Sequence, residues 1–440
     1  MTRGDDGCAL TPHRLRYAVL GAGAAGLTLA LRLARAGQDV TVLEREPMPG
    51  GLAAGFRVGD AWLEKFYHHL FQSDRAILSL IEELGLGGQM HWGTPETRVL
   101  WQGEMHRLDS ALTLLRFPAL PLPDRLRMGA ALAYLKASRN PARLEGQMAA
   151  AWISTWMGRR AASVVWEPLL GAKFGTRADQ IAAPWFWARV HDRTRALGYL
   201  RGGFQQLYDR LADELRAAGG RLHCETAVTG ICRAPEGGLR VETDAACTRY
   251  DRVVSCLPTR VTCRLAPELP EAYRRRYDWG EAFGAHCLVL ALDRPLSGGY
   301  WLNVNDAGYP FMVVVEHTNF LPAADYGGRH LLYLGNYRPM DDPLLQQDAE
   351  TVFAAFAPHL RRINPAFDPT WVRERWLFSA PYAQPVVTRD YRAHIPPFAT
   401  PLPGLYTANM FQIYPHDRGQ NYSVALAERL ARHLLATPTR

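Results

Sequence analysis

The stretch Tyr17–Glu44, YAVLGAGAAGLTLALRLARAGQDVTVLE, carries the strongest structural signal of the chain. Its first four residues, YAVL, form a short apolar run that is typical of a buried parallel strand. Gly21, Gly23 and Gly26 follow in the spacing G-x-G-x-x-G, and the leucine-rich run after them predicts a helix. The run VTVL then predicts a second strand that ends at Glu44. This order of strand, glycine loop, helix, strand and acid is typical of a dinucleotide-binding βαβ unit.

Each glycine of the loop has a separate physical role. Gly21 allows a tight turn, Gly23 lets the backbone approach a pyrophosphate, and Gly26 lets the helix pack closely on the sheet. The first turn of the helix presents free N–H groups and a partial positive charge. Glu44 lies 23 residues after Gly21, where a carboxylate can accept hydrogen bonds from ribose hydroxyls. The alternative is an ordinary βαβ unit whose glycines serve only helix packing.

Length and composition are those of a globular protein. The chain has 440 residues, of which 48% are hydrophobic and 21% charged, and its length predicts two to three domains. No apolar run reaches the roughly 18–20 residues of a membrane span, so any membrane contact would be peripheral. Residues 1–14 include acids and no apolar core. We therefore expect a loose leader there rather than a signal peptide, and a cytoplasmic location.

The net charge of +7 comes almost entirely from arginine. Only Lys65, Lys136 and Lys173 are lysines, so 47 of the 50 basic residues are arginines. Such a bias is typical of a GC-rich bacterial genome, and it also suits anion recognition because the guanidinium fork matches phosphate. No block of basic residues of the kind found in nucleic-acid-binding arms is present. We therefore expect a small, anionic substrate and no nucleic acid.

Other cofactors and chemistries find little support in the sequence. The seven cysteines are odd in number and form no C-x-x-C pair, which argues against a disulfide framework and a zinc site. No H-E-x-x-H metal pair and no G-x-S-x-G nucleophile motif occurs. We therefore expect no metal site.

The rest of the chain alternates between α/β and other patterns. A helix is predicted over 74–85, a hairpin over 98–108, a mainly helical region over 110–190 and a helix over 348–363. A last helix is predicted from about Asn421 to Leu435. Five of the twelve tryptophans lie in the helical region, where they could form an aromatic core or the wall of a substrate cleft. The expected domains are a nucleotide-binding domain (15–75, 203–265 and 400–437), a helical region (76–202) and a β-rich substrate domain (266–399).

Several motifs along the chain resemble those of the FAD-binding amine oxidase and protoporphyrinogen oxidase superfamily, which includes phytoene desaturases and UDP-galactopyranose mutase. They are the βαβ unit ending at Glu44, Pro49-Gly50-Gly51, Val228, Asp251-Arg252-Val253-Val254 and Gly404-Leu405-Tyr406. The resemblance covers nearly the whole chain. It implies an α/β fold with a discontinuous, glutathione-reductase-like Rossmann domain for FAD, an inserted helical region and a mixed-sheet substrate domain.

Four stretches are most similar to UDP-galactopyranose mutase-like flavoenzymes. They are KFYHHLF (65–71), KFGTR (173–177), EHTNF (316–320) and TRDY (388–391). The likeness implies that His69 lies at the flavin face and Arg389 near a substrate diphosphate. Leu52, Asn409 and Val313 depart from the patterns of these families, and no cysteine is adjacent to Asn409, so we expect non-covalent FAD.

Together, motifs and resemblance give a set of candidate site residues. The expected FAD contacts are Gly21, Gly23, Ala24, Ala25, Gly26, Glu44, Arg45, Gly50, Gly51, Leu52, Val228, Asn409, Asn421 and Tyr422. The expected catalytic residues are His69, Arg389 and Tyr414, and the expected substrate contacts are Arg177, Arg189 and Arg389. Asn421 is expected to cap the last helix, whose N-terminus would stabilise negative charge on the flavin.

Three functions remain open at this point. The first is an FAD-dependent oxidoreductase that takes hydride from a phosphate-bearing or sugar-nucleotide substrate. The second is a redox-neutral mutase or isomerase that uses reduced flavin on a nucleotide sugar. The third is an oxidase or desaturase of an apolar prenyl or tetrapyrrole substrate. The arginines favour the first two, and the tryptophans favour the third.

Overall fold

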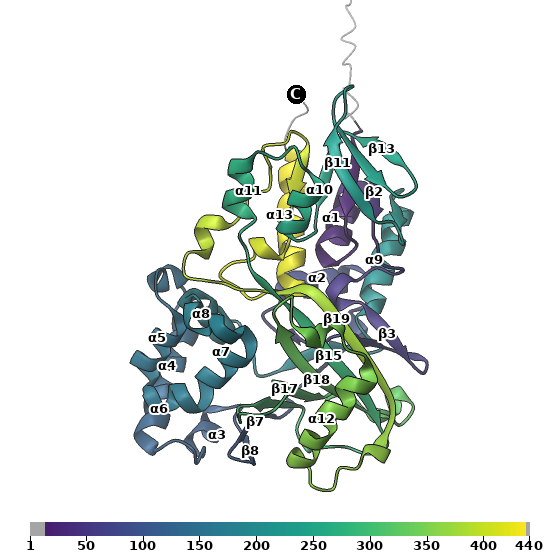
Figure 1. Ribbon diagram of the computed structural model, residues 1–440. Coiled ribbons are helices and arrows are strands. Elements are labelled where there is room, and N and C mark those ends of the chain that lie inside the picture. Colours follow the sequence, from purple (N-terminus) through teal and green to yellow (C-terminus); the bar gives the residue numbers. More distant parts are fainter. Residues whose placement is uncertain (1–13, 437–440) are drawn as a thin grey trace, which may run out of the picture.

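A five-stranded parallel sheet carries the predicted βαβ unit in a computed structural model that describes residues 14–436 (Figure 1). The strands come from three separate parts of the chain, which confirms the discontinuous α/β fold inferred from the sequence. In sheet order they are β10 (Arg221–His223), β2 (Asp39–Leu43), β1 (Arg16–Leu20), β14 (Arg252–Ser255) and β20 (Leu405–Thr407). The predicted leader, 1–14, lies outside the described residues except for its last one.

Helix α1 (Ala24–Arg35) packs beside α13 (Gln420–Ala436) and α9 (Gln205–Ala217), as Figure 1 shows. Its apolar residues recur at helical spacing, so they form one continuous face, and this face is buried. Helix α2 (Arg75–Glu83) also packs against α13. We call the five-stranded sheet and these four helices the cofactor half. The last helix of the chain therefore completes a layer that the first helix begins.

A seven-stranded mixed sheet forms the second layer of the molecule. In sheet order its strands are β19 (Val372–Pro385), β15 (Ala282–Leu292), β18 (His330–Arg338), β17 (Val313–Glu316), β16 (Trp301–Val304), β7 (Thr97–Trp101) and β8 (Glu104–Arg107). All eleven residues of β15 are buried. Alternate residues of β15 point into different cores, because α12 (Ala349–Ile363) covers one face and the cofactor half packs on the other.

The inserted helical lobe lies at the left of Figure 1. Its helices are α3 (Ala111–Leu115), α4 (Leu122–Ala137), α5 (Ala149–Met157), α6 (Arg159–Ala161), α7 (Glu167–Phe174) and α8 (Ala183–His191). Trp152, Trp185 and Trp187 are buried in its core, whereas Trp156 is exposed. Trp166 and Trp185 also line the cavity described below. The tryptophans thus lie both in an aromatic core and on a cavity wall.

Smaller elements complete the fold. Three small antiparallel sheets are formed by β11 (Val228–Arg233), β12 (Leu239–Thr243) and β13 (Cys247–Tyr250); by β3 (Gly55–Val58) and β4 (Ala61–Glu64); and by β5 (Leu70–Phe71), β9 (Leu197–Leu200) and β6 (Met90–Gly93). Two short helices, α10 (Thr259–Leu265) and α11 (Glu271–Tyr277), follow β14. Within residues 14–436, no helix combines the length and the apolar character needed to cross a bilayer.

Candidate active site

The glycine loop after β1 has a backbone that only glycine can form at two positions. Gly21 has a φ of +99°, which a residue with a Cβ rarely adopts. At Gly26, an added Cβ would lie 1.9 Å from the carbonyl oxygen of Gly21. The loop and the first turn of α1 are therefore held in direct backbone contact, as the glycine spacing predicted.

The N-terminus of α1 is open to an anion. Gly23 is its N-cap, no side chain of the described residues caps it, and its first turn contains no acid. The turn at Gly50–Gly51 lies against this loop, since a Cβ on Gly51 would come within 3.3 Å of the Gly23 Cα atom. The N–H groups of Ala24 and Ala25 lie in this uncapped first turn. These backbone groups suit a diphosphate.

Glu44 ends β2 beside this loop and is buried. Its carboxylate accepts hydrogen bonds from the N–H of Ala22 (2.7 Å) and of Glu46 (3.0 Å). Its carbonyl accepts from Thr226 N–H (2.8 Å), which brings the start of β11 at Val228 next to it. Arg45 is exposed and pairs only with Glu46 among the described acids. Glu44 thus supports the loop with oxygens that can also face a ribose.

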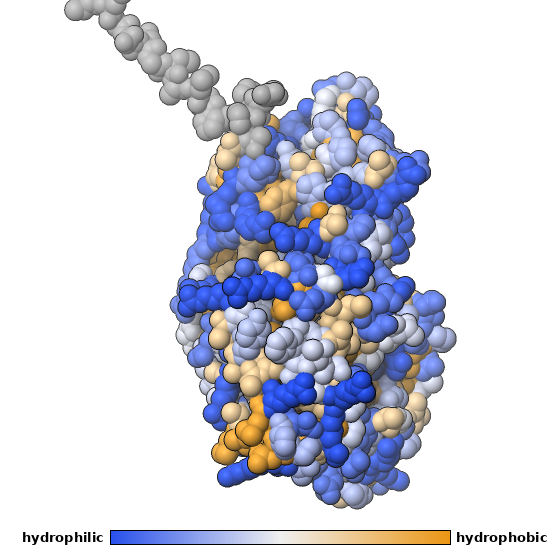
Figure 2. Space-filling model, turned by 90° about the vertical axis from the view of Figure 1, so that its left-hand side faces the viewer, coloured by the Kyte–Doolittle hydropathy of each residue, from blue (hydrophilic) through white to orange (hydrophobic). Residues whose placement is uncertain are grey.

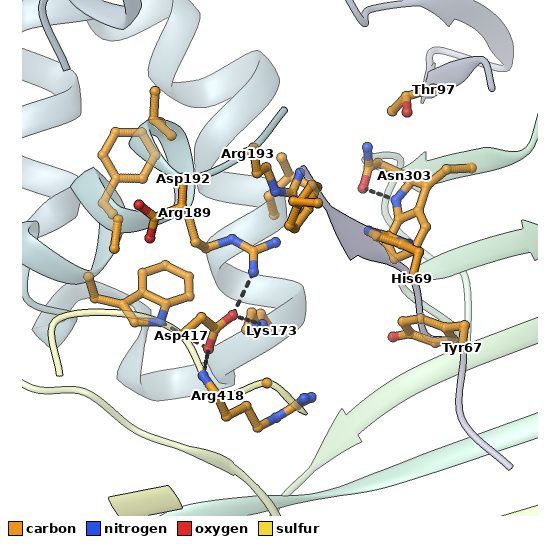
Figure 3. A pocket seen from close by; sticks show the side chains of 18 of the residues that line it. Tyr67, His69, Thr97, Lys173, Arg189, Asp192, Arg193, Asn303, Asp417 and Arg418 are labelled. Atoms are coloured by element: carbon orange, nitrogen blue, oxygen red, sulfur yellow. Dashed lines mark hydrogen bonds and ion pairs between the residues drawn. The ribbon is translucent and has the colours of Figure 1, made fainter. Parts of the chain in front are cut away.

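A cavity of about 810 Å³ lies between the cofactor half, the helical lobe and the mixed sheet. Figure 3 shows Lys173, Arg189 and Arg193 on its helical side, and Tyr67, His69 and Asn303 on its sheet side. Among the residues expected from the sequence, the lining includes Leu52, His69, Arg189, Asn421 and Tyr422. The cavity therefore reaches from the start of α13 into the helical lobe.

Asp417 is the centre of a charged cluster on the cavity wall (Figure 3). It accepts hydrogen bonds from Arg189 (2.6 Å), Lys173 (3.2 Å) and the indole N–H of Trp185 (3.2 Å). Although burial acts in the opposite direction, Lys173 and Arg189 hold the pKa of the Asp417 carboxyl well below its usual range. Burial lowers the pKa of Lys173 despite this partner. The cluster fixes two cationic side chains at the cavity.

Arg193 differs from Arg189 because its guanidinium makes no ion pair or hydrogen bond with any residue of 14–436. It lies 5.8 Å from the ring centre of Phe71 and projects into the cavity in Figure 3. Desolvation and the nearby Arg189 lower its pKa to about 9, so it is still a cation at neutral pH. An unpaired cation in a cavity is a natural contact for an anionic ligand group.

The histidines of the cavity are neutral at physiological pH. Burial lowers the pKa of His69 to about 3 and that of His68 to about 4. The Nδ1 atom of His69 lies 3.3 Å from the Tyr300 hydroxyl, and Nδ1 of His68 donates to the carbonyl of Phe66 at 2.6 Å. His286, on β15, is fully buried with both ring nitrogens unpartnered in the described structure. Neutral rings can donate or accept one hydrogen bond at each nitrogen.

Three residues expected at the substrate lie away from this cavity. Arg177 pairs with Glu281 (2.8 Å), Arg389 is exposed beside Asp390 (3.6 Å), and the Tyr414 hydroxyl donates to Glu145 (2.9 Å). None of the three lines the cavity. The short motifs that suggested Arg177 and Arg389 fix a position in the chain, but the direction of a side chain depends on the tertiary packing around it. We therefore assign these residues no contact with the substrate.

Asn421 does not cap its own helix, contrary to expectation, and the side chain of Asn409, an expected FAD contact, caps a nearby turn. Asn421 lies inside α13, and its side-chain oxygen accepts from the N–H of Ala76 (2.9 Å) and Ile77 (3.2 Å). It therefore caps α2 rather than its own helix, because the start of α13 packs against the start of α2. Asn409 is buried and its side chain caps the 3₁₀ turn Met410–Gln412. Its amide also donates to Thr259 (3.3 Å).

Asp192 forms a second polar cluster that the sequence did not reveal. Its carboxylate lies 2.6 Å from Nδ1 of His416 and accepts from the Tyr422 hydroxyl at 2.8 Å. Although burial opposes them, hydrogen bonds from His416 and His191 lower the pKa of Asp192. More than two hundred residues separate Asp192 from His416 and Tyr422, so no local spacing could indicate these two contacts. The cluster fixes Tyr422 at the cavity wall.

Comparison with known proteins identifies the family of this chain. The pattern described as "Flavin containing amine oxidoreductase" matches residues 24–416. The chain belongs to this flavin-dependent amine oxidoreductase family. Membership implies a flavin cofactor and an enzyme that acts on small molecules, and the uncapped helix and glycine loop described above fit a flavin nucleotide. Within the described residues, no group of three His, Cys, Asp or Glu side chains could hold a metal ion.

Proteins similar to this chain in fold or sequence bear names of different reactions. A protein assigned as a protoporphyrinogen oxidase from Exiguobacterium sp. 255-15 has a TM-score of 0.76 and 19% identity, over 96% of this chain and 99% of that one. Reduced UDP-galactopyranose mutase has a TM-score of 0.75 and 14% identity, over 97% and 96% of the two chains. A 15-cis-phytoene desaturase of Synechococcus elongatus is 37% identical over 79 residues, only 18% of this chain and 17% of the desaturase. These similarities establish the fold and leave the reaction open.

Proposed function

We propose that the protein is an FAD-dependent oxidoreductase whose substrate combines an anionic group with an apolar portion. The observation that carries this proposal is the unpaired Arg193 in a cavity whose remaining helical wall is mostly apolar. The apolar part of that wall includes Leu114, Met128, Leu132, Val165, Trp166, Leu169, Phe186 and Val190. A wholly polar sugar nucleotide would leave this wall in contact with polar groups, and a wholly apolar substrate would leave Arg193 without a partner.

FAD rather than a smaller flavin is supported by the cofactor half. The glycine loop and the open end of α1 suit a diphosphate, and Glu44 lies where the ribose of an adenosine half would sit. Val228, next to Glu44 through the Thr226 contact, is our candidate for the adenine side. Flavin mononucleotide has no adenosine and would use none of these last contacts.

Non-covalent binding is supported by the state of Cys287, which lines the cavity. Burial raises the pKa of this thiol well above its usual range. Because the thiolate is the nucleophilic form of cysteine, the sulfur of Cys287 is a poor candidate for a covalent flavin link. No other cysteine lines the cavity in the part of the chain that the structure describes.

A bound flavin would accept hydride from a substrate C–H bond. The side chains of the protein would bind and orient the substrate. Arg193, with Arg189 held by Asp417 beside it, would contact the anionic group. His69, neutral and half-buried, would exchange one hydrogen bond at Nε2, since Nδ1 faces Tyr300. The apolar helical wall would exclude water from the reacting carbon.

A redox-neutral mutase is the second candidate. It is favoured by the stretch KFYHHLF, which places His69 on the cavity wall, and by the two neighbouring arginines, which also suit a diphosphate. The two candidates predict different ligands. If the protein is a mutase, its reduced form should bind UDP-galactose, and the redox state of the flavin should show no net change.

The deciding experiment measures ligand binding to the FAD-loaded protein by its flavin absorbance. We expect a prenyl diphosphate to bind at least tenfold more tightly than inorganic pyrophosphate, and Arg193→Gln to weaken both. Arg389→Gln is the matched control, since Arg389 is exposed and outside the cavity. A protein that takes up no FAD contradicts the proposal. Tight binding of UDP-galactose by the reduced form, with no tighter binding of the prenyl compound, supports the mutase instead.

A further inference from the structure

The surface of α3 and α4 carries an unusual group of exposed leucines. The exposed fractions are 56% for Leu112, 42% for Leu115, 55% for Leu122 and 56% for Leu126. Figure 2, which views the molecule from the side of the helical lobe, shows apolar residues gathered near its lower end. Single exposed leucines are common, but a contiguous group of this kind marks a contact surface. We call these four residues the leucine patch.

The leucine patch is continuous with the mouth of the cavity. On α4, Leu122 and Leu126 share one helix face with Gly129, Ala133 and Lys136, because these positions are spaced by four, three, four and three residues. The last three of them line the cavity, and Ala133 and Lys136 are exposed. The cavity therefore reaches the surface on the face of α4 that carries the two leucines.

Helix α3 borders the same opening. Ala111, its first residue, lines the cavity and is exposed, and Leu112 is the next residue along. Leu114 of the same helix is buried and also lines the cavity. Both helices that carry the leucine patch thus also form the rim of the mouth.

The charge around the leucine patch is strongly positive. Residues 110–162 contain two acids, Asp124 and Glu145, and eight basic residues, Arg116, Arg125, Arg127, Lys136, Arg139, Arg143, Arg159 and Arg160. This segment therefore has a net charge of +6, close to the +7 of the whole chain.

The cations of this segment are not neutralised by the protein. Arg116 and Arg159 are exposed and make no hydrogen bond or ion pair from their side chains within residues 14–436. Arg125, Arg127 and Arg160 donate only to backbone carbonyls of the described chain. Their positive charge is available to an external anionic partner.

We propose that the leucine patch and its arginines bind an anionic lipid bilayer, so that the cavity mouth opens toward the membrane. Leucines beside arginines suit this partner, because apolar side chains enter the acyl boundary while cations contact lipid phosphates. A second copy of this chain suits the surface less well. A two-fold dimer would place the same +6 segment on both sides of the interface, where like charges repel.

The test is co-sedimentation of the FAD-loaded protein with lipid vesicles. We expect binding to phosphatidylcholine vesicles that contain phosphatidylglycerol, and much weaker binding to pure phosphatidylcholine. The variant Leu122→Gln with Leu126→Gln should bind the anionic vesicles at least tenfold less tightly. Both side chains are more than half exposed, so the fold and the flavin spectrum should be unchanged.

Two further double variants distinguish binding at this site from nonspecific adsorption to the vesicles. Met340→Gln with Leu435→Gln removes two exposed apolar side chains elsewhere (39% and 45% exposed) and should leave vesicle binding unchanged. Arg116→Gln with Arg159→Gln should weaken it severalfold and flatten its dependence on salt.

Three results would overturn the proposal. They are the absence of binding to anionic vesicles, equal binding by the Leu122→Gln, Leu126→Gln variant, and a dimer that this variant dissociates while vesicles are not bound. The last result, read by analytical ultracentrifugation, would identify a second copy as the partner. Vesicle binding needs no turnover, so its failure is distinguishable from failure of the proposed oxidoreductase activity.

Discussion

Arg32 of the cofactor half and two arginines of the helical lobe, Arg116 and Arg159, have opposite surroundings. In the cofactor half, Arg32 of α1 bonds Glu83 of α2 (2.5 Å) and Glu428 of α13 (2.8 Å). In the helical lobe, Arg116 and Arg159 have no acidic partner among the described residues. The first arrangement ties three helices together, whereas the second leaves charge at the surface. Paired arginines therefore mark structure here, and unpaired ones mark places where a partner is expected.

The cavity lies between the cofactor half and the helical lobe, and it contains both paired and unpaired polar groups. Asp417 is surrounded by donors, whereas Arg193 and His286 lack partners in the described structure. Substitutions of paired groups should act mainly on stability, and substitutions of unpaired groups mainly on binding or on the response to pH.

The largest effect is expected for Asp417→Asn. The substitution leaves Lys173 and Arg189 without their buried counter-charge, which should lower the free energy of unfolding by about 3–5 kcal/mol. Urea denaturation followed by fluorescence measures this. Asp390→Asn is the control, since Asp390 is exposed and its loss should cost less than about 0.5 kcal/mol. Equal stability of the two variants would contradict the role given to Asp417.

Gly26→Ala should cost about 3 kcal/mol and reduce the flavin content. The added Cβ would lie 1.9 Å from the Gly21 carbonyl oxygen, and the backbone of the loop must move to accept it. Thermal unfolding and the flavin-to-protein absorbance ratio measure the two effects. The control is Gly88→Ala, where nothing lies within 4 Å of the new methyl group. Normal flavin content in Gly26→Ala would show that the close contact is not needed.

His286→Leu should change how stability depends on pH. Burial lowers the pKa of His286 from 6.5 to about 4, so the folded protein keeps this ring neutral while the unfolded chain protonates it. In the wild type, the contribution of the neutral His286 ring to the free energy of unfolding is fully present above pH 6.5. It is lost as the pH falls toward 4. The leucine variant lacks this loss and should gain roughly 3 kcal/mol relative to wild type between pH 7 and pH 4. Parallel stability curves over that range would contradict the prediction.

The smallest effect on stability is expected when the substitutions of two arginines are compared directly. Arg32→Gln removes two ion pairs and should lower stability by about 1 kcal/mol, less at high salt. Arg116→Gln removes no pair and should leave stability unchanged within about 0.3 kcal/mol. Denaturation at low and high salt measures both. If Arg116→Gln were as destabilising as Arg32→Gln, Arg116 would have a partner in the folded chain.

The cofactor half could be predicted from the sequence because its signals are local. The elements between Tyr17 and Glu44 follow one another directly, and the structure forms both strands within one residue of the expected positions, with a helix between them. The hairpin over 98–108 and the helix over 348–363 are equally local and also present. In each case neighbouring residues determine both the element and its buried face.

The cavity could be predicted only in part because distant residues build it. His69, expected at the flavin face, and Arg189, expected at the substrate, both line it, but the partner of Arg189, Asp417, is 228 residues away. Asn421 illustrates the same limit. Its position before the last helix suggested a cap, and only the packing of α13 on α2 shows which helix receives it. Nothing in the local sequence of Arg389 shows that it faces away from the cavity.

The position of β20 and α13 has a consequence for biosynthesis. Strand β14 gains its second neighbour only when residues 405–407 arrive, and α1 gains its neighbour α13 only after residue 420. During translation, the nucleotide-binding layer must therefore wait beside an open sheet edge while the helical lobe and the mixed sheet are made. The protein should be most vulnerable to aggregation in this interval, and premature termination within its last helix should be far more damaging than the small number of missing residues suggests.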